Sequence, residues 1–187
     1  MTKRQNKKII RNLGYRIVDE MSQGLCDVYL VKENNSNKEV FRTLKIATDS
    51  RTSGYRHILT ENKVLDGLKK VNGVAKKIDY KHILISRNNA LVLVKEFIEG
   101  ETLFDKYCKF DKQQQKSLEQ TVNSIHRVGF AQLDLKSQNI VIADNKKPYL
   151  IDLGTAVSRK SMSPVAFANY EKKDIERLEN IFKDMYF

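Results

Sequence analysis

The chain of 187 residues has no tryptophan, two prolines, two cysteines and eight glycines. With so little proline and glycine, no Pro/Gly-rich linker divides it, and no internal repeat or low-complexity tract is visible. Cys26 and Cys108 are too far apart to suggest a metal knuckle or a disulfide framework. We therefore expect one cytoplasmic domain, held together by a core rather than by cross-links.

Long hydrophobic runs are also missing. The longest, from Ala90 to Val94, has five residues, whereas a membrane-spanning helix needs roughly 20. The basic N-terminus, with Lys3, Arg4, Lys7 and Lys8, lacks the apolar segment that follows such charges in a signal peptide. We expect no transmembrane segment and no export.

Positive charge is in excess, with 34 lysines and arginines against 23 acidic residues and a net charge of +11. Such a chain attracts nucleotides, acidic proteins, nucleic acids and anionic lipids. The lysines are spread over the whole length, without the arginine and aromatic stripe that stacks bases. A solvated basic surface is thus favoured over a nucleic-acid-binding face, which the charge still leaves open.

The first half of the sequence is typical of β-strands and the second half of helices. β-branched and aromatic residues between Gly, Asn and Ser predict five strands, at 15–18, 28–31, 40–46, 81–85 and 91–94. Apolar residues at helical spacing predict helices near 54–70, 111–128 and 174–185. Asp111 with Gln114 forms a capping-box pattern, and Gly129 is a natural stop. We expect an α+β protein with a β-rich and a helical lobe.

Two polar motifs flank a predicted hairpin in the second half. Asp134 and Asn139 lie five residues apart just before the apolar run 140–142, and Asp152 follows another short strand and precedes Gly154. Phosphoryl transfer needs a carboxylate near the attacking hydroxyl and oxygen ligands for Mg²⁺. Each motif alone is common. Together, with Asp152 lying 18 positions after Asp134 and a predicted hairpin between them, they form a more specific pattern than either motif alone.

Two further segments fit the same chemistry. Lys45 lies within an apolar strand, so its ammonium needs an anionic partner, and Glu61 on the following helix is the natural one. Gly24 lies between the first two predicted strands and Val28 begins the second, where a loop could cover phosphates. The alternative for Lys45 is an outward-facing lysine, and the alternative for Asp152 is an ordinary Asp-Leu-Gly turn.

In this order the motifs resemble the protein kinase superfamily over nearly the whole chain. The resemblance implies a bilobal kinase-like fold of residues 1–187, with an N-lobe at about 12–96, a hinge at 96–100 and an abbreviated helical C-lobe at 101–187. It implies ATP and Mg²⁺ as cofactors. The roles it implies are a catalytic base at Asp134, a charge-neutralising Lys136, metal ligands at Asn139 and Asp152, and nucleotide contacts at Lys45, Glu61, Gly24, Val28, Glu96 and Ile98.

Departures from the family pattern leave the acceptor open. Lys136 resembles the loop lysine of serine/threonine kinases and favours a protein acceptor, with the chain itself, at Thr155, Ser158, Ser161 or Ser163, as one candidate. The short segment between Asp152 and Asp174 is also similar to bacterial lipopolysaccharide core sugar kinases, which would make the acceptor a glycolipid sugar. A single loop glycine, and Gln132-Leu133 in place of His-Arg, would suit a pseudokinase that binds nucleotide without turnover.

Overall fold

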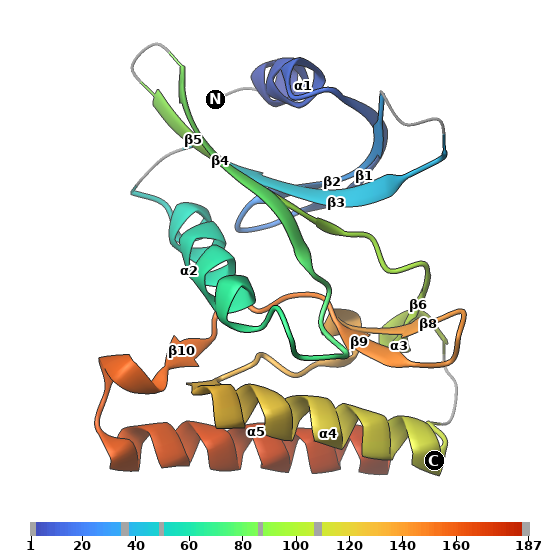
Figure 1. The fold of residues 1–187 in the computed structure, drawn as a ribbon, viewed down its shortest axis with the longest axis vertical. Coiled ribbons are helices and arrows are strands. Elements are labelled where there is room, and N and C mark those ends of the chain that lie inside the picture. Colours follow the sequence, from blue (N-terminus) through green and yellow to red (C-terminus); the bar gives the residue numbers. More distant parts are fainter. Residues whose placement is uncertain (1–2, 35–37, 49–50, 86–87, 107–109, 185–187) are drawn as a thin grey trace. The chain divides into compact units, whose positions relative to one another are not determined.

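The computed structural model describes residues 3–34, 38–48, 51–85, 88–106 and 110–184, and it has an α+β fold (Figure 1). The chain forms two compact units. The first unit comprises Met1–Asn62 and Lys76–Phe97, and the second comprises Lys63–Ala75 and Ile98–Phe187. The first holds an antiparallel sheet and the second most of the helical residues. The expected division into a strand-rich and a helix-rich half is confirmed.

The first unit is built on a five-stranded sheet. Its strands lie in the order β1-β2-β3-β5-β4, and every neighbouring pair is antiparallel. The elements along the chain are α1 (Lys3–Asn12), β1 (Tyr15–Gln23), β2 (Asp27–Glu33), β3 (Phe41–Ala47), α2 (Ser53–Gly67), β4 (Lys77–Ile85) and β5 (Asn88–Glu96). All five predicted strands are present, and all but β3 are longer than the predicted segment because pairing carries polar flanking residues into the sheet.

The two faces of this sheet have different chemistry because side chains alternate along each strand. One face is apolar: Leu44 and Ile46 of β3 join Val92 and Val94 of β5 in a buried cluster with Ile9, Ile10, Tyr29, Val31 and Ala90. Helix α1 supplies the two isoleucines and lies over the sheet in Figure 1. The other face carries Lys45 and Lys95, whose ammonium groups contact Glu61 of α2.

The second unit combines two long helices with short strands. It contains β6 (Gly100–Thr102), α3 (Leu103–Lys106), α4 (Lys112–Val128), β7 (Phe130–Ala131), η1 (Ser137–Asn139), β8 (Ile140–Ala143), β9 (Pro148–Leu150), β10 (Val157–Ser158), η2 (Arg159–Ser161) and α5 (Pro164–Asp184). Strands β6, β8 and β9 form one sheet, and β7 pairs with β10. Helices α4 and α5 lie side by side (Figure 1), with the Phe110 and Phe182 rings 5.8 Å apart.

Helix α4 confirms the capping prediction in detail. The Asp111 carboxylate accepts from the Gln114 backbone nitrogen at 2.8 Å, and the Gln114 side-chain oxygen accepts from the Asp111 backbone nitrogen at 3.1 Å. Gly129 ends the helix with a left-handed φ of 99°. Of the predicted apolar stripe, Leu118, Val122 and Ile125 are fully buried. Val128, the fourth apolar residue at this spacing, is 47% exposed and does not join them in the core.

Two helices differ from the prediction. Helix α5 begins at Pro164, ten residues before the expected start, because Pro is favoured in the first helical turn while the following residues have only a weak apolar pattern. Helix α1 was not predicted at all. Its apolar residues, Ile9 and Ile10, are adjacent and give no helical stripe, so its position depends on burial against the sheet. Met185, expected on the last helix, and Cys108 lie outside the described residues.

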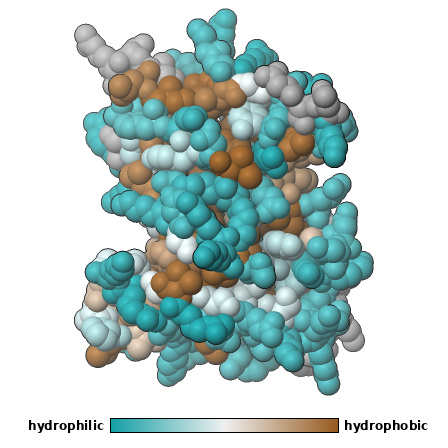
Figure 2. Space-filling view, viewed as in Figure 1, coloured by the Kyte–Doolittle hydropathy of each residue, from teal (hydrophilic) through white to brown (hydrophobic). Residues whose placement is uncertain are grey.

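The surface is predominantly polar. Figure 2 shows teal hydrophilic side chains over most of one face, with smaller brown hydrophobic patches among them. The exposed large hydrophobic residues are Val18, Met21, Leu25, Ile78, Leu84, Phe104, Val128 and Val165. Within the described part of the chain, no helix is both long enough and apolar enough to cross a bilayer.

Gly54, in the first turn of α2, is packed against the turn that joins β1 and β2. A Cβ atom at this position would lie 1.7 Å from the Leu25 carbonyl oxygen and 2.7 Å from the Leu25 carbonyl carbon. Both atoms belong to backbone and cannot rotate away. The turn can therefore rest on the helix only because residue 54 has no side chain.

We expect Gly54→Ala to lower the thermal midpoint, although alanine in a helix normally adds about 1 kcal/mol of stability over glycine. Gly24→Ala is the matched control, because a Cβ at Gly24, in the turn itself, meets no atom within 4 Å. Thermal unfolding followed by circular dichroism measures both variants. Equal midpoints for the two would show that the turn does not need the close approach.

Candidate functional site

The predicted lysine and glutamate of the first unit form a buried ion pair. The Nζ atom of Lys45 lies 2.7 Å from an oxygen of Glu61, and the two side chains are 5% and 1% exposed. Lys45 is held in the middle of β3, opposite Val28 of β2 and Leu93 of β5. Val28 is half-buried, and cross-strand pairing places it on the same face of the sheet as Lys45.

A second lysine contacts the same carboxylate. Lys95 of β5 donates to the other oxygen of Glu61 at 2.5 Å, and its side chain is 2% exposed. Thr43 is its direct neighbour on β3, one pleat from Lys45. The predicted strand ends at residue 94, directly before Lys95, so the rule that a buried ammonium needs an anion was applied only to Lys45. Lys95 is therefore a partner of Glu61 that the predicted Lys45–Glu61 pair did not include.

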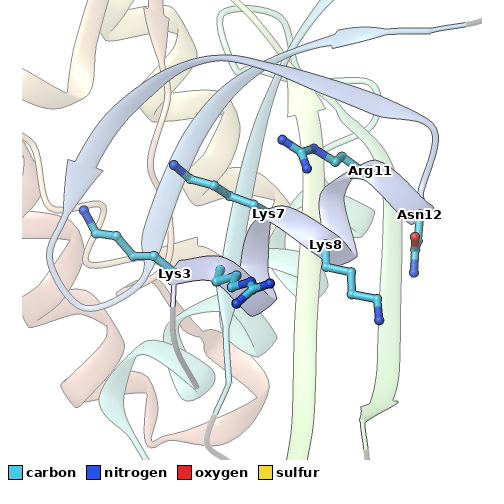
Figure 3. A pocket seen from close by; sticks show the side chains of 6 residues that line it. Lys3, Lys7, Lys8, Arg11 and Asn12 are labelled. Atoms are coloured by element: carbon cyan, nitrogen blue, oxygen red, sulfur yellow. The ribbon is translucent and has the colours of Figure 1, made fainter.

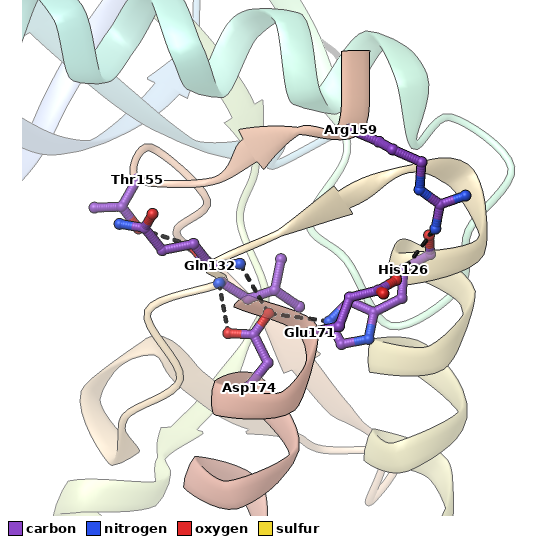
Figure 4. Close-up of polar contacts among 7 residues, drawn as sticks. His126, Gln132, Thr155, Arg159, Glu171 and Asp174 are labelled. Carbon is purple, nitrogen blue, oxygen red and sulfur yellow. Dashed lines mark hydrogen bonds and ion pairs between the residues drawn. The ribbon is translucent and has the colours of Figure 1, made fainter. Parts of the chain in front are cut away.

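In the second unit, the segment before η1 has an unusual backbone. Gln132 and Asp134 have φ angles of 60° and 48°, which lie in the left-handed region that residues other than glycine rarely adopt. The Asp174 carboxylate holds this backbone by accepting from the Gln132 nitrogen at 2.8 Å and from the Leu133 nitrogen at 2.9 Å (Figure 4). Such residues cost about 1–3 kcal/mol each, so the surrounding contacts must fix them.

His126 completes this anchor. Its Nε2 atom lies 3.0 Å from the Asp174 carboxylate, and the histidine is 7% and the aspartate 1% exposed (Figure 4). The His126 side chain therefore belongs to a buried contact with Asp174 and is not an exposed polar cap at the end of α4. Arg159 donates to the His126 carbonyl and to Glu171, each at 3.1 Å. The sequence holds a signal for this burial, since His126 lies four positions after Val122 and so on the apolar side of the predicted helix.

The anchored backbone leads directly to three predicted polar residues that contact one another. Lys136 Nζ lies 2.7 Å from an Asp134 carboxylate oxygen. Asn139 Nδ2 donates to that same oxygen at 3.1 Å and to the Asp134 carbonyl at 3.0 Å. Asp134 and Lys136 are 35% and 51% exposed, so solvent screens their attraction, and the contact orients the carboxylate more than it stabilises the fold.

Asn139 and Asp152 lie at the same end of the β8–β9 hairpin. Asn139 directly precedes β8, and Asp152 follows β9. Ile140 of β8 pairs with Leu150 of β9 at this end of the hairpin. The Ile151 nitrogen donates to the Asn139 carbonyl at 3.0 Å, which joins the two segments just beyond the last ladder pair. Since Asn139 donates through Nδ2 to Asp134, its amide oxygen points away from that carboxylate. An amide oxygen and a carboxylate are ligands that suit Mg²⁺.

The remaining predicted residues lie in connecting segments. Gly24 is exposed in the β1–β2 turn, where its nitrogen donates to the Cys26 carbonyl at 3.4 Å. Glu96 ends β5, and its nitrogen donates to the Lys76 carbonyl at 2.8 Å. Burial lowers the pKa of Lys76, and the nearby Glu96 carboxylate partly offsets this effect. Ile98, half-buried, begins the part of the second unit that follows β5.

Most of the chain is similar to a known protein family. Residues 15–172 match the family model described as the protein kinase domain. The match begins at β1, so it leaves α1 outside, and it contains every residue predicted to act in catalysis or binding. No curated protein matches the chain, and the similarity to lipopolysaccharide core sugar kinases is therefore not confirmed. Because the match covers most of the chain, this protein belongs to the protein kinase domain family of phosphotransferases.

Proposed function

We propose that the chain transfers the γ-phosphate of ATP, with Mg²⁺, to a serine or threonine hydroxyl of a protein. The observation that carries this proposal is the contact of Asp134 with Lys136 and Asn139, on a backbone that Asp174 holds in place. An oriented carboxylate next to an ammonium group suits a reaction in which a hydroxyl loses a proton while a phosphoryl group arrives.

Each group in the second unit has a distinct role in this proposal. Asp134 accepts the proton of the attacking hydroxyl, whose oxygen forms a bond to the γ-phosphorus as the bond from that phosphorus to the ADP oxygen breaks. Lys136 offsets the negative charge of the transferring group. Asn139 and Asp152 would hold the cation, which neutralises phosphate oxygens when it is bound.

The first unit would supply the nucleotide contacts. Lys45 binds phosphate oxygens while Glu61 fixes its ammonium group, as the 2.7 Å contact between them allows. The turn at Gly24 covers the phosphates, and Val28 offers an apolar surface beside Lys45. Backbone groups of Glu96 and Ile98 bind adenine. Lys95 is not a phosphate ligand in this scheme, since its role is to hold the second oxygen of Glu61.

The hydroxyl groups after Asp152 favour a separate protein acceptor over the chain itself. Thr155 donates to the Gln132 carbonyl at 3.2 Å, and Ser161 donates to the Ser158 carbonyl at 2.7 Å. Ser158 accepts from the Lys160 nitrogen and Ser163 accepts from the Ala166 nitrogen, each at 3.3 Å. Thr155 thus contacts the Gln132 segment, and the three serines belong to a local turn and to the start of α5, where phosphorylation would disturb existing hydrogen bonds.

The first test is transfer of labelled γ-phosphate from ATP and Mg²⁺ to the components of a cell extract. We expect label in the protein fraction. Asp134→Asn should reduce transfer by about 10²–10⁴-fold, because the amide keeps the shape of the side chain but cannot accept the proton. Asp144→Asn is the matched control, an exposed aspartate in the turn after β8.

The distribution of label separates the alternatives. Label in the glycolipid fraction that disappears in Asp134→Asn would replace the protein acceptor by a sugar. Nucleotide binding without label in either fraction would contradict transferase activity and support a pseudokinase. Label on the purified chain alone, lost in Thr155→Ala or Ser158→Ala, would make the chain its own acceptor.

The two buried lysines give a second test, since they contact the same carboxylate from neighbouring strands. Lys45→Met should reduce transfer by about 100-fold or more, because the phosphates lose a charged ligand. Lys95→Met should cost less than about tenfold, since Lys45 and Glu61 remain as a neutral pair. Steady-state rates at several ATP concentrations measure both effects. An equal loss in the two variants would make Lys95 a nucleotide ligand as well.

The free energy of unfolding should depend much more on Glu61 than on Lys95. Glu61→Gln removes the carboxylate that both buried ammonium groups contact, and removing one partner of a buried pair costs about 3–5 kcal/mol. Lys95→Met replaces a buried charge by an apolar side chain of similar length and should change the free energy of unfolding by about 1 kcal/mol or less. Denaturant unfolding of both variants checks this difference, and a Glu61→Gln variant as stable as wild type would contradict it.

A further inference from the structure

Helix α1 has a composition unlike the rest of the chain. Its ten residues include five cations and no acidic residue: Lys3, Arg4, Lys7, Lys8 and Arg11. The match to the protein kinase domain begins at residue 15, so this helix lies outside the part that the family accounts for. None of the residues proposed for phosphoryl transfer belongs to it. Its charge therefore needs a separate explanation.

The sheet fixes the orientation of α1. Ile9 and Ile10 are 5% and 0% exposed in the core of the first unit, and the Asn6 amide nitrogen donates to the Asp27 carboxylate at 2.6 Å. All apolar residues of the helix are consequently used for folding. The exposed side chains are all basic or amide: Lys3, Arg4, Gln5, Lys8, Arg11 and Asn12.

All five cations of α1 and Asn12 line a hollow of about 530 Å³, and Figure 3 shows the side chains of Lys3, Lys7, Lys8 and Arg11 spreading outward from the helix. Lys3 and Lys7 contact Glu20 of β1 at 3.2 and 2.7 Å. Hydrogen bonds from Lys7 and Lys3 lower the pKa of Glu20, so its carboxylate stays ionised at neutral pH. One carboxylate against five cations leaves most of the positive charge of α1 available.

The remaining three cations form a row. Among the described residues, Arg4, Lys8 and Arg11 have no ion-pair partner. They are separated by four and three positions, which places them on one side of a helix and about 6 and 4.5 Å apart along its axis. A ligand that satisfies all three must carry several negative charges in a line.

The chemistry of the exposed face selects among polyanions. A helix that lies on a bilayer inserts apolar side chains, whereas those of α1 are buried in the protein. Protein interfaces rely on apolar or aromatic anchors at their centre, and the exposed residues of α1 include none. Arginine, lysine, asparagine and glutamine are the side chains that contact the phosphates of nucleic acids.

We propose that the exposed face of α1 binds the phosphate backbone of a nucleic acid, independently of base sequence. The absence of aromatic side chains on this face implies that bases are not stacked. Binding then depends on charge alone and should weaken steeply with salt. The proposal does not require ATP or transferase activity, so it can fail or succeed separately from the function proposed above.

The experiment measures fluorescence anisotropy of a labelled 20-base-pair DNA duplex and a labelled 20-nucleotide RNA of mixed sequence. The whole protein is titrated without nucleotide at several salt concentrations. For the triple variant R4Q/K8Q/R11Q we expect an affinity loss of about tenfold or more at 50 mM salt. The slope of log affinity against log salt for the duplex should fall by about 2–3, the contribution of three phosphate contacts.

The matched control is K112Q/K116Q/K172Q, which removes the same charge from exposed positions on α4 and α5. It should bind nearly as well as wild type. Circular dichroism and thermal unfolding of both triple variants establish that each is folded. The single variant Lys8→Gln, with an expected slope change of about 1, tests the same point with the smallest change to the helix.

Three results would overturn the proposal. Wild-type protein that shows no salt-dependent binding to either probe would remove the activity itself. An equal loss of affinity in both triple variants would attribute binding to net charge rather than to α1. Vesicles containing anionic lipid serve as a third probe, and loss of vesicle binding in R4Q/K8Q/R11Q with unchanged nucleic-acid binding would make the face a membrane contact.

Discussion

The geometry of the proposed catalytic loop depends on one buried carboxylate. Asp174 accepts two backbone hydrogen bonds from residues 132 and 133 and lies beside the His126 ring. These contacts hold Gln132 and Asp134 in backbone conformations that their side chains disfavour. Asp134 can therefore meet Lys136 and Asn139 only while α5 carries Asp174 against this segment. A residue 40 positions away in the sequence thus sets the orientation of the proposed base.

The first unit has a comparable constraint in Glu61. A carboxylate that is 1% exposed would be costly in a protein interior, but each of its oxygens accepts from a lysine. The two lysines come from adjacent strands, so the side chain of Glu61 is held from two directions. This arrangement does not by itself imply a stable fold, since buried ion pairs often contribute little net free energy. It does restrict the orientation in which α2 can pack on the sheet.

Patterns that depend on neighbouring residues were readable from the sequence. The strands, the Asp111 cap and the hairpin between Asn139 and Asp152 each reflect local spacing or alternation, and the structure contains all of them. The lysine–glutamate pair was also found, because a charge within an apolar strand must have a partner. The family resemblance added the roles of these residues, which spacing alone does not assign.

Features that depend on distant contacts were not readable. Helix α1 is defined by two isoleucines buried against strands far along the chain, and the early start of α5 follows no apolar repeat. The sequence alone did not predict that Lys95 contacts the second carboxylate oxygen of Glu61. Counting lysines over the whole chain likewise gave a scattered charge, whereas the fold gathers five cations on one helix whose apolar residues face the other way.

Helix α2 connects these constraints within the first unit. Gly54 and Glu61 are seven positions apart and so lie on nearly the same side of the helix. The backbone of the β1–β2 turn packs directly against Gly54, while the Glu61 carboxylate forms ion pairs with both lysines of the sheet. A shift of α2 by even one residue would bring a side chain against Leu25 and move the carboxylate away from Lys45 and Lys95. The turn proposed to cover the phosphates and the lysine proposed to bind them are therefore positioned by the same helical face.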